Sequence, residues 1–343
     1  MPFGLFSSKG TEADLACSIH MKYFAPATLI LAATLAPVAH AQPTPSTVED
    51  ASYAGGPLPE GQSGIATVVQ VLLDRAGISP GVIDGYRGPM SRSAIRAFET
   101  REGLDADGEM DQAVWDALGG PERGTVLQDY QITDADTADL SDPLPDDYAE
   151  LAKLDRLAFT RVTERLAEKF HMDEGFLKDL NPEAQFVPGE TITVAAPGER
   201  KQTKANRIEV RKAVGRVAVF DDAGTMIANY PATVGSDQLP SPSGKHEVTA
   251  IAIDPTYAYK PDENFQQGDN KEPLTLPPGP NGPVGSVWID LSKPTYGIHG
   301  TADPDSLFQS VSHGCVRLTN WDATELAHMV DSGVPVVFVS DGS

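Results

Sequence analysis

The chain has 343 residues, of which 26 are Lys or Arg and 49 are Asp or Glu, so its formal net charge at pH 7 is −23. This length is sufficient for two or three domains, each with its own hydrophobic core. Because so acidic a surface repels polyanions, we expect neither nucleic acid nor an anionic lipid surface as a partner.

Residues 1–41 are typical of an export signal. The segment MKYFAPATLILAATLAPVAHA, residues 21–41, contains a lysine near a methionine, an apolar run and a small-x-small cleavage sequence at its end. The run is too short for a membrane-spanning helix, and we expect no transmembrane segment after processing. The polar residues before Met21 are most simply explained by a translation start at Met21. Cys17 lacks the upstream apolar residue of a lipoprotein signal, so we do not expect its lipidation.

Residues 42–60 are rich in Pro, Ser, Thr and Gly and predict a linker. The apolar residues of 65–73 then recur at helical spacing, a second helix is expected over about 91–102, and Asp111 is placed to cap a third. We therefore predict a small three-helix bundle over residues 61–120.

The order of elements in this bundle includes an IDG turn, a helix ending near Phe98 and a short helix that carries Trp115. This order resembles the helical peptidoglycan-binding domain of bacterial cell-wall enzymes. A generic three-helix bundle is the alternative interpretation. The zinc-site histidines usual in that family are absent, so the resemblance implies no metal here.

Residues 121–147 are polar and acidic and predict a second linker. In residues 148–198, apolar residues at helical spacing are followed by Asp173 as a helix cap and by the strand-like run TITVA. This segment resembles the second half of a lysin motif, a small α+β fold that binds the glycan of peptidoglycan. The opening strand of that motif is not recognisable.

Residues 205–341 favour β structure. Short alternating segments such as IEVRKAV, GKHEVTAIAI and VPVVFVS are separated by Pro and Gly turns, and DATELAHMVDSG is the one clear helix. This pattern predicts a closed or sandwich-like β-fold, with the site carried on loops that include residues 254–285.

Cys315 would be the single cysteine left after removal of the export signal. Such a thiol is either a reactive group or an inert, buried one. Gly314 allows close approach of a substrate, while His313 and Arg317 place a titratable ring and a positive charge beside the sulfur, which favours the thiolate. Either His313 or the upstream His299 could accept the thiol proton.

The side chains of His299, His313 and Cys315 could also ligate zinc. No further cysteine is left in the processed chain, and a histidine and a cysteine separated only by Gly314 seldom close such a site. We therefore expect no metal and no cofactor.

The motifs IHGT, residues 298–301, and SHGCVRLTN, residues 312–320, resemble the signature of the L,D-transpeptidases, cysteine enzymes that remodel bacterial peptidoglycan. The flanking segments PSPSGKHEV and PPGPNGPVGSVWIDLSKPTYGIHG are similar to that family too, and the likeness covers about residues 205–340. It implies a multidomain protein whose mainly β, sandwich-like L,D-transpeptidase domain follows the helical bundle and the lysin-motif-like domain.

The resemblance implies that Cys315 is the nucleophile and His299 the general base, oriented by the backbone carbonyl of Gly300. It further implies an oxyanion hole formed by backbone N–H groups around His313, Gly314 and Cys315. The expected substrate-binding residues are Arg317, Tyr296, Ser312 and Asn320. Bracing of the turn is the simpler role for Ser312 and Asn320, and packing is an alternative for Tyr296 and the favoured role for Trp288.

The implied reaction is attack of the thiolate on the L-centre of diaminopimelate in a tetrapeptide stem, release of D-alanine, and acyl transfer to an amine to form a 3→3 crosslink. Water or a lipoprotein lysine as acceptor would instead give an L,D-carboxypeptidase or an anchoring reaction. A peptidoglycan-binding protein without catalysis is the alternative from another class. The expected partners are stem peptides and glycan, the expected covalent inhibitors are carbapenems, and the expected location is the periplasm, at the cell wall.

Overall fold

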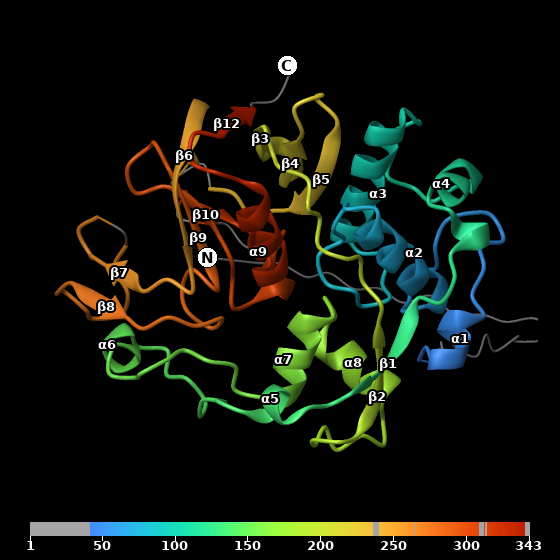
Figure 1. The fold of residues 1–343 in the computed structure, drawn as a ribbon, viewed down its shortest axis with the longest axis horizontal. Helices are drawn as coiled ribbons and strands as arrows, with labels where there is room; N and C mark the ends of the chain where they lie inside the picture. Colours follow the sequence, from blue (N-terminus) through green and yellow to red (C-terminus); the bar gives the residue numbers. More distant parts are fainter. Residues whose placement is uncertain (1–41, 236–239, 264, 309–311, 313, 340–343) are drawn as a thin grey trace, which may run out of the picture. The chain divides into compact units, whose positions relative to one another are not determined.

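The computed structural model describes residues 42–235, 240–263, 265–308, 312 and 314–339 (Figure 1). The expected export signal, with Cys17, lies outside these residues. None of the described helices is long and apolar enough to cross a membrane. The buried apolar side chains of the described residues form three hydrophobic cores.

Residues 42–122 form helices that are joined by loops. They are α1 (Pro45–Glu49), α2 (Gly64–Arg75), α3 (Pro89–Glu102), α4 (Gln112–Ala117) and the short 3-10 helix η1 (Gly120–Glu122). The expected caps are present: Ser63 Oγ accepts a hydrogen bond from the backbone N–H of Ala66, and Asp111 accepts one from that of Val114. Helix α3 ends at Gly103, whose φ of 71° is the left-handed conformation that glycine adopts most easily.

The prediction that residues 42–60 are a linker was wrong. Val48 and Leu58 are buried in the first core, which also contains the apolar faces of α2 and α3. Glu49 Oε1 accepts hydrogen bonds from the backbone N–H groups of Val126 and Leu127. The prediction failed because it used the average composition of the segment, which is polar, whereas its few apolar residues lie at buried positions.

The second predicted linker, residues 121–147, likewise contains regular structure. Strand β1 (Leu127–Gln131) pairs antiparallel with β2 (Thr191–Ala195), and helices α7 (Val162–Lys169) and α8 (Glu174–Leu180) lie between them in sequence. Only one residue of β1 is fully buried, so alternation could not reveal the strand. Two short helices, α5 (Asp134–Thr137) and α6 (Tyr148–Leu151), precede α7.

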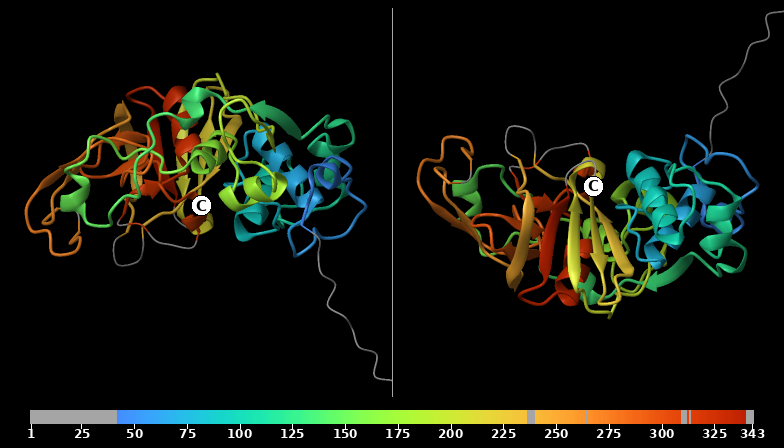
Figure 2. Two further views of the ribbon diagram at one scale, coloured as in Figure 1. Left: turned by 90° about the horizontal axis from the view of Figure 1, so that it is seen from below. Right: turned by 90° about the horizontal axis from the view of Figure 1, so that it is seen from above.

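The C-terminal half is dominated by an eight-stranded sheet with the order β11-β10-β9-β6-β12-β3-β4-β5. Figure 2 shows β12 between β6 and the strands β3 to β5. The pairs β10·β11 and β12·β3 are parallel, and the other pairs are antiparallel. The strands of this sheet are β3 (Arg207–Arg211), β4 (Arg216–Phe220), β5 (Met226–Pro231), β6 (Gly244–Ile253), β9 (Val287–Leu291), β10 (Gly297–His299), β11 (Val316–Arg317) and β12 (Pro335–Val339).

Strand β6 connects the two halves of this sheet. Its first four residues pair with β12, and Val248 and later residues pair with β9. One core contains residues of both halves together with helix α9 (Asn320–Met329). A strand shared in this way is typical of two packed β layers. Two 3-10 helices, η2 (Lys212–Val214) and η3 (Pro304–Ser306), lie in connections.

The third core joins two distant parts of the chain. Strands β7 (Tyr257–Tyr259) and β8 (Leu274–Leu276) form a hairpin that packs against α6. Tyr148 of α6 makes edge contacts with the rings of Tyr257 and Tyr259. Arg156 forms a two-pronged ion pair with Asp254, at 2.6 and 3.0 Å. The segment before α7 therefore supports the hairpin that precedes β9.

Candidate active site

Strand pairing brings Cys315 and His299 to one face of the sheet. Strands β10 and β11 are parallel, with Ile298 opposite Val316 and His299 opposite Arg317. Cys315 directly precedes β11, and side chains alternate between the faces of a strand, so Cys315, Arg317 and His299 share a face. The other face, with Ile298 and Val316, is buried in the core.

The ring of His299 is held in one orientation. Its Nδ1 lies 2.7 Å from the carbonyl oxygen of Gly300, so Nδ1–H donates and Nε2 carries the free lone pair. The ring stacks on Trp288, with 5.5 Å between ring centroids and 20° between planes. Burial lowers the pKa of His299 to about 4, the bond to Gly300 raises it, and the charge of Arg317 lowers it further. The imidazole is therefore neutral at pH 7.

Cys315 Sγ lies 3.8 Å from the carbonyl oxygen of Thr295 and donates to it. Burial raises the pKa of the thiol, against the smaller lowering by the Gly297 backbone and by Arg317. The charge of Arg317 favours the thiolate, as expected, but loss of hydration on burial outweighs this effect. The resting pair is a neutral thiol and a neutral imidazole.

The turn before Cys315 is closed by hydrogen bonds. Ser312 Oγ donates to the carbonyl oxygen of Cys315 at 2.5 Å and accepts from the N–H of Gly314 at 3.1 Å. Gly314 has a φ of +112°, and a Cβ there would lie 2.7 Å from the ring of Tyr296. Ser312 is buried, and its hydroxyl is used within the turn. The Gly314 N–H is likewise used inside the turn, so it reaches a substrate oxygen only if this bond opens. His313 lies outside the described residues.

Arg317 and Tyr296 border the thiol. The backbone of Arg317 exchanges two hydrogen bonds of 2.9 Å with Thr233. Burial lowers the pKa of its guanidinium, while Asp303 and Cys315 raise it. Tyr296 packs against Gly314, and the amine of Lys293 lies 5.9 Å from the centre of its ring. Among the described residues, no group of three or more His, Cys, Asp or Glu side chains is arranged to hold a metal ion.

Comparison with known sequences identifies two segments. Residues 205–338 match the sequence model of the L,D-transpeptidase catalytic domain, and residues 65–118 match one described as "Putative peptidoglycan binding domain". The protein named "Putative L,D-transpeptidase YkuD" of Bacillus licheniformis is 31% identical over 179 residues, which cover 50% of this chain and 90% of that relative. The chain belongs to the L,D-transpeptidase family.

A second L,D-transpeptidase relative, YkuD of Bacillus subtilis, is 51% identical over 57 residues, and the match covers 17% of this chain and 35% of the relative. A solved L,D-transpeptidase from Xylanimonas cellulosilytica is 15% identical with a TM-score of 0.37, and the match covers 84% of this chain and 98% of that one. The first core of this L,D-transpeptidase lies mostly outside the segment that matches the catalytic domain.

Asn320 of this L,D-transpeptidase has a different position from the one expected. It is 3% exposed, its amide nitrogen donates to the carboxylate of Glu168 and to the carbonyl of Pro280, and its Oδ1 accepts from the N–H of Ser286. A Cβ on Gly300 would lie 2.2 Å from Asn320 Oδ1. The polar atoms of Asn320 are therefore used inside the fold, and its side chain packs against the Gly300 backbone.

Two further residues of the site were missed by sequence reasoning. One is Tyr257 of the β7–β8 hairpin. Burial raises the pKa of its phenol, and the negative charge of a Cys315 thiolate would raise this pKa further, which places the two side chains near each other. Thr295, which accepts the thiol hydrogen bond, has a φ of 70°, an uncommon value for a β-branched residue. The only signal for Tyr257 was its place in the loop region expected to carry the site.

Proposed function

We propose that this chain is a cysteine L,D-transpeptidase that acts on peptidoglycan stem peptides. The observation that carries the proposal is the parallel β10–β11 pairing, which puts Cys315 and His299 on one face of the sheet, with Nδ1 of His299 already bonded to Gly300. Family membership supplies the reaction class. We assign catalysis to residues 205–341 and attachment to the wall to the helical region 61–120.

The charge states define the order of proton movement. Because the pKa of the thiol is raised and that of His299 is low, a preformed ion pair is unfavourable. The thiol proton therefore moves to His299 Nε2 as Sγ attacks the carbonyl carbon of the diaminopimelate L-centre. The resulting imidazolium then gives this proton to the amine of D-alanine as the C–N bond breaks, which leaves a thioester on Cys315.

The second transfer reverses these roles. A side-chain amine of another stem attacks the thioester, His299 accepts a proton from it, and the thiol is restored as the C–S bond breaks. The product is a 3→3 crosslink. Water in place of the amine gives a tripeptide stem, and a lipoprotein lysine gives an anchored protein. Backbone N–H groups near Cys315 stabilise the oxyanion, which requires the Ser312–Gly314 bond to open.

The accessory regions support a location at the cell wall. Residues 65–118 match a domain described as peptidoglycan-binding. Strands β1 and β2 pair with each other, and helices α5 to α8 lie between them in sequence. We assign glycan binding to this unit as well, from its resemblance to a lysin motif. We place the protein in the periplasm, after removal of the export signal.

The deciding experiment incubates the purified protein with disaccharide tetrapeptide and analyses the products by mass spectrometry. We expect a crosslinked dimer and free D-alanine from the wild type and neither from Cys315→Ala. The variant should still co-sediment with sacculi. A carbapenem should add its mass at Cys315. An unmodified protein under acylating conditions, with sacculus binding intact, would support the wall-binding alternative without catalysis.

A further inference from the structure

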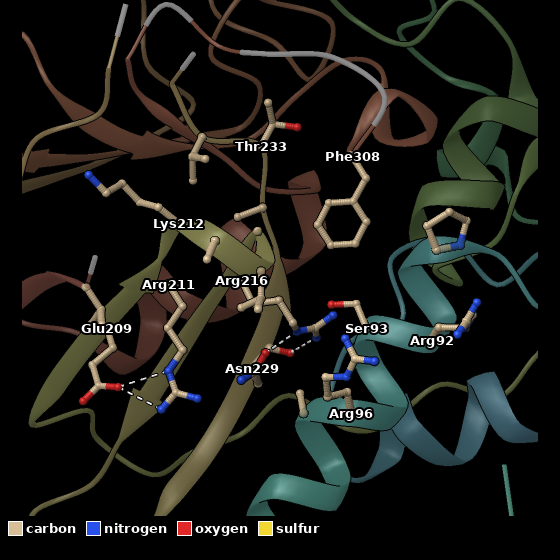
Figure 3. Close-up of a pocket in the computed structure, with 18 of the residues that line it drawn as sticks. Arg92, Ser93, Arg96, Glu209, Arg211, Lys212, Arg216, Asn229, Thr233 and Phe308 are labelled. Atoms are coloured by element: carbon tan, nitrogen blue, oxygen red, sulfur yellow. Dashed lines mark hydrogen bonds and ion pairs between the residues drawn. The ribbon is translucent and has the colours of Figure 1, made fainter. Parts of the chain in front are cut away.

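A large cleft lies beside helix α3 and is not used by the proposed reaction. Its volume is about 1120 Å³. Residues at the start of α3 and along it line one side, and residues of β3, η2, β4 and β5 line the other (Figure 3). The protein has a formal charge of −23, yet this cleft is lined by six basic residues and one carboxylate. The basic residues are Arg87, Arg92, Arg96, Arg211, Lys212 and Arg216.

The basic side chains of this cleft are only partly neutralised. Arg87 and Arg92 both form ion pairs with Glu109, which does not line the cleft. The one lining carboxylate, Glu209, pairs with Arg211 at 2.9 Å and also with Arg207. Among the described residues, Arg96 and Lys212 form no ion pair, and their side chains donate to backbone carbonyl oxygens. Positive charge therefore remains available on both sides of the cleft.

Arg216 gives an independent indication of an anionic ligand. Its side chain is 2% exposed, and it donates through Nε to Asn229 Oδ1 and through Nη2 to the carbonyl oxygens of Ser79 and Asn229. Its Nη1 has no hydrogen-bond partner among the described residues. The charge of Asp322 raises the pKa of this guanidinium, but no described carboxylate lies within ion-pair distance of it. Figure 3 shows the guanidinium directed from β4 towards α3. A buried cation with an unused donor is unfavourable unless an anion reaches it.

The cleft extends to the neighbourhood of Cys315. Thr233 and Gly235 line one end of it. Thr233 exchanges both backbone hydrogen bonds with Arg317, and Gly235 bridges to Ser312. A ligand in the cleft therefore lies against the segment that carries the nucleophile.

We propose that this cleft binds the carboxylates of a peptidoglycan stem peptide while another part of the substrate occupies the thiol site. The inference rests on the proposed function for the identity of the peptide. Five of the six basic residues are arginines, whose planar forks match carboxylates. Ala97, Val214 and Phe308 also line the cleft and suit the aliphatic parts of a peptide.

The test measures binding by calorimetry with the full processed chain in a Cys315→Ala background, which prevents turnover. The probes are disaccharide tetrapeptide and the same molecule with its carboxyls amidated. The test variant is Arg96→Glu/Lys212→Glu, because both side chains line the cleft and neither forms an ion pair with a described carboxylate. The control variant is Lys153→Glu/Lys204→Glu, with the same charge change at exposed sites outside the cleft.

We expect the test variant to bind the acidic peptide at least about tenfold more weakly than the control variant, from two lost charged contacts. Amidation should weaken binding to the control variant and should matter little for the test variant. Equal affinities of the two variants, or of the two probes for the control, would overturn the inference. A phosphate-rich wall polymer that binds the cleft while the peptide does not would also overturn it.

Acylation of the wild type by a carbapenem tests the proposed function separately. A protein that is acylated at Cys315 but shows no cleft-dependent peptide binding contradicts only this inference. A protein that binds the peptide through the cleft but is not acylated contradicts only the proposed function.

Discussion

His299 on β10 and Arg216 on β4 are both basic side chains that the fold removes from water, and burial has opposite consequences for them. His299 loses its charge, because burial lowers its pKa to about 4 although the hydrogen bond to Gly300 raises it. Burial also lowers the pKa of Arg216, to about 9, but this group stays charged at pH 7 and keeps one donor unused. Burial thus leaves a neutral imidazole at the first position and a charged guanidinium with one unused donor at the second.

The largest expected effect tests the base. Glutamine at position 299 can keep the hydrogen bond to Gly300 but cannot accept a proton from the thiol. We expect His299→Gln to lower kcat/KM for disaccharide tetrapeptide by about 10³-fold, within the range of general acid–base catalysis. Circular dichroism should show an unchanged fold. A loss below about tenfold would mean that another group takes the proton.

The pH dependence of acylation tests the burial of His299. Its folded pKa, about 4, lies below the ordinary value of 6.5, so the neutral base persists well into acid. The rate of carbapenem acylation should therefore fall to half near pH 4 and not near pH 6.5. The contribution of this group to stability, present above pH 6.5, is lost as the pH falls towards 4. A midpoint near 6.5 would indicate a hydrated imidazole.

Substitutions of Arg216 test the second buried basic side chain, which stays charged. Arg216→Met removes the buried charge and every donor, whereas Arg216→Lys keeps the charge. We expect Arg216→Met to bind disaccharide tetrapeptide about tenfold more weakly than wild type, and Arg216→Lys to lose less. Urea unfolding of each variant checks that the fold is retained. Wild-type affinity in a folded Arg216→Met protein would remove this residue from the cleft site.

Glu168 allows a smaller test of how burial changes the charge of a side chain, here for an acid. Burial raises its pKa to about 8, against the lowering by the hydrogen bond from Asn320. A raised acid pKa means that its stabilising contribution is full below pH 4.5 and is lost as the pH rises through 8. Glu168→Gln should therefore raise the free energy of unfolding at pH 8.5 by on the order of 1 kcal/mol, with little change at pH 5. A gain equal at both pH values would exclude titration of Glu168 as the cause.

The parts of this molecule that sequence could predict are those in which chemistry restricts the residue type locally. The thiol, the upstream histidine and the glycine after it are recognisable because the reaction requires them in fixed order. Strand β6 was predicted from its alternation, and its bounds coincide with the GKHEVTAIAI run. Both substrate binding and bracing were open for Asn320, since a motif does not reveal that its amide donates to Glu168. Arg216 and Tyr257 depend on contacts between distant segments.

The charge state of Cys315 shows a second limit. Neighbours along the chain indicate which charges are near the sulfur, but the degree of hydration depends on the whole fold. Burial in the N-terminal segments could not be predicted from sequence neighbours either. A few apolar residues in a polar stretch, such as Val48 and Leu58, become core only because α2 and β1 surround them.

The third core has a consequence for dissecting the molecule. Leu151 and Leu157, which precede α7, cover Tyr259 and Leu276 of the β7–β8 hairpin, and the Leu157 N–H bonds to the Pro278 carbonyl. A fragment beginning at residue 205 would lose this cover, although it contains the whole family match. Chimeras that exchange catalytic halves between relatives should therefore carry residues 144–160 with the hairpin, since cutting where the family boundary lies separates two partners of one folding unit.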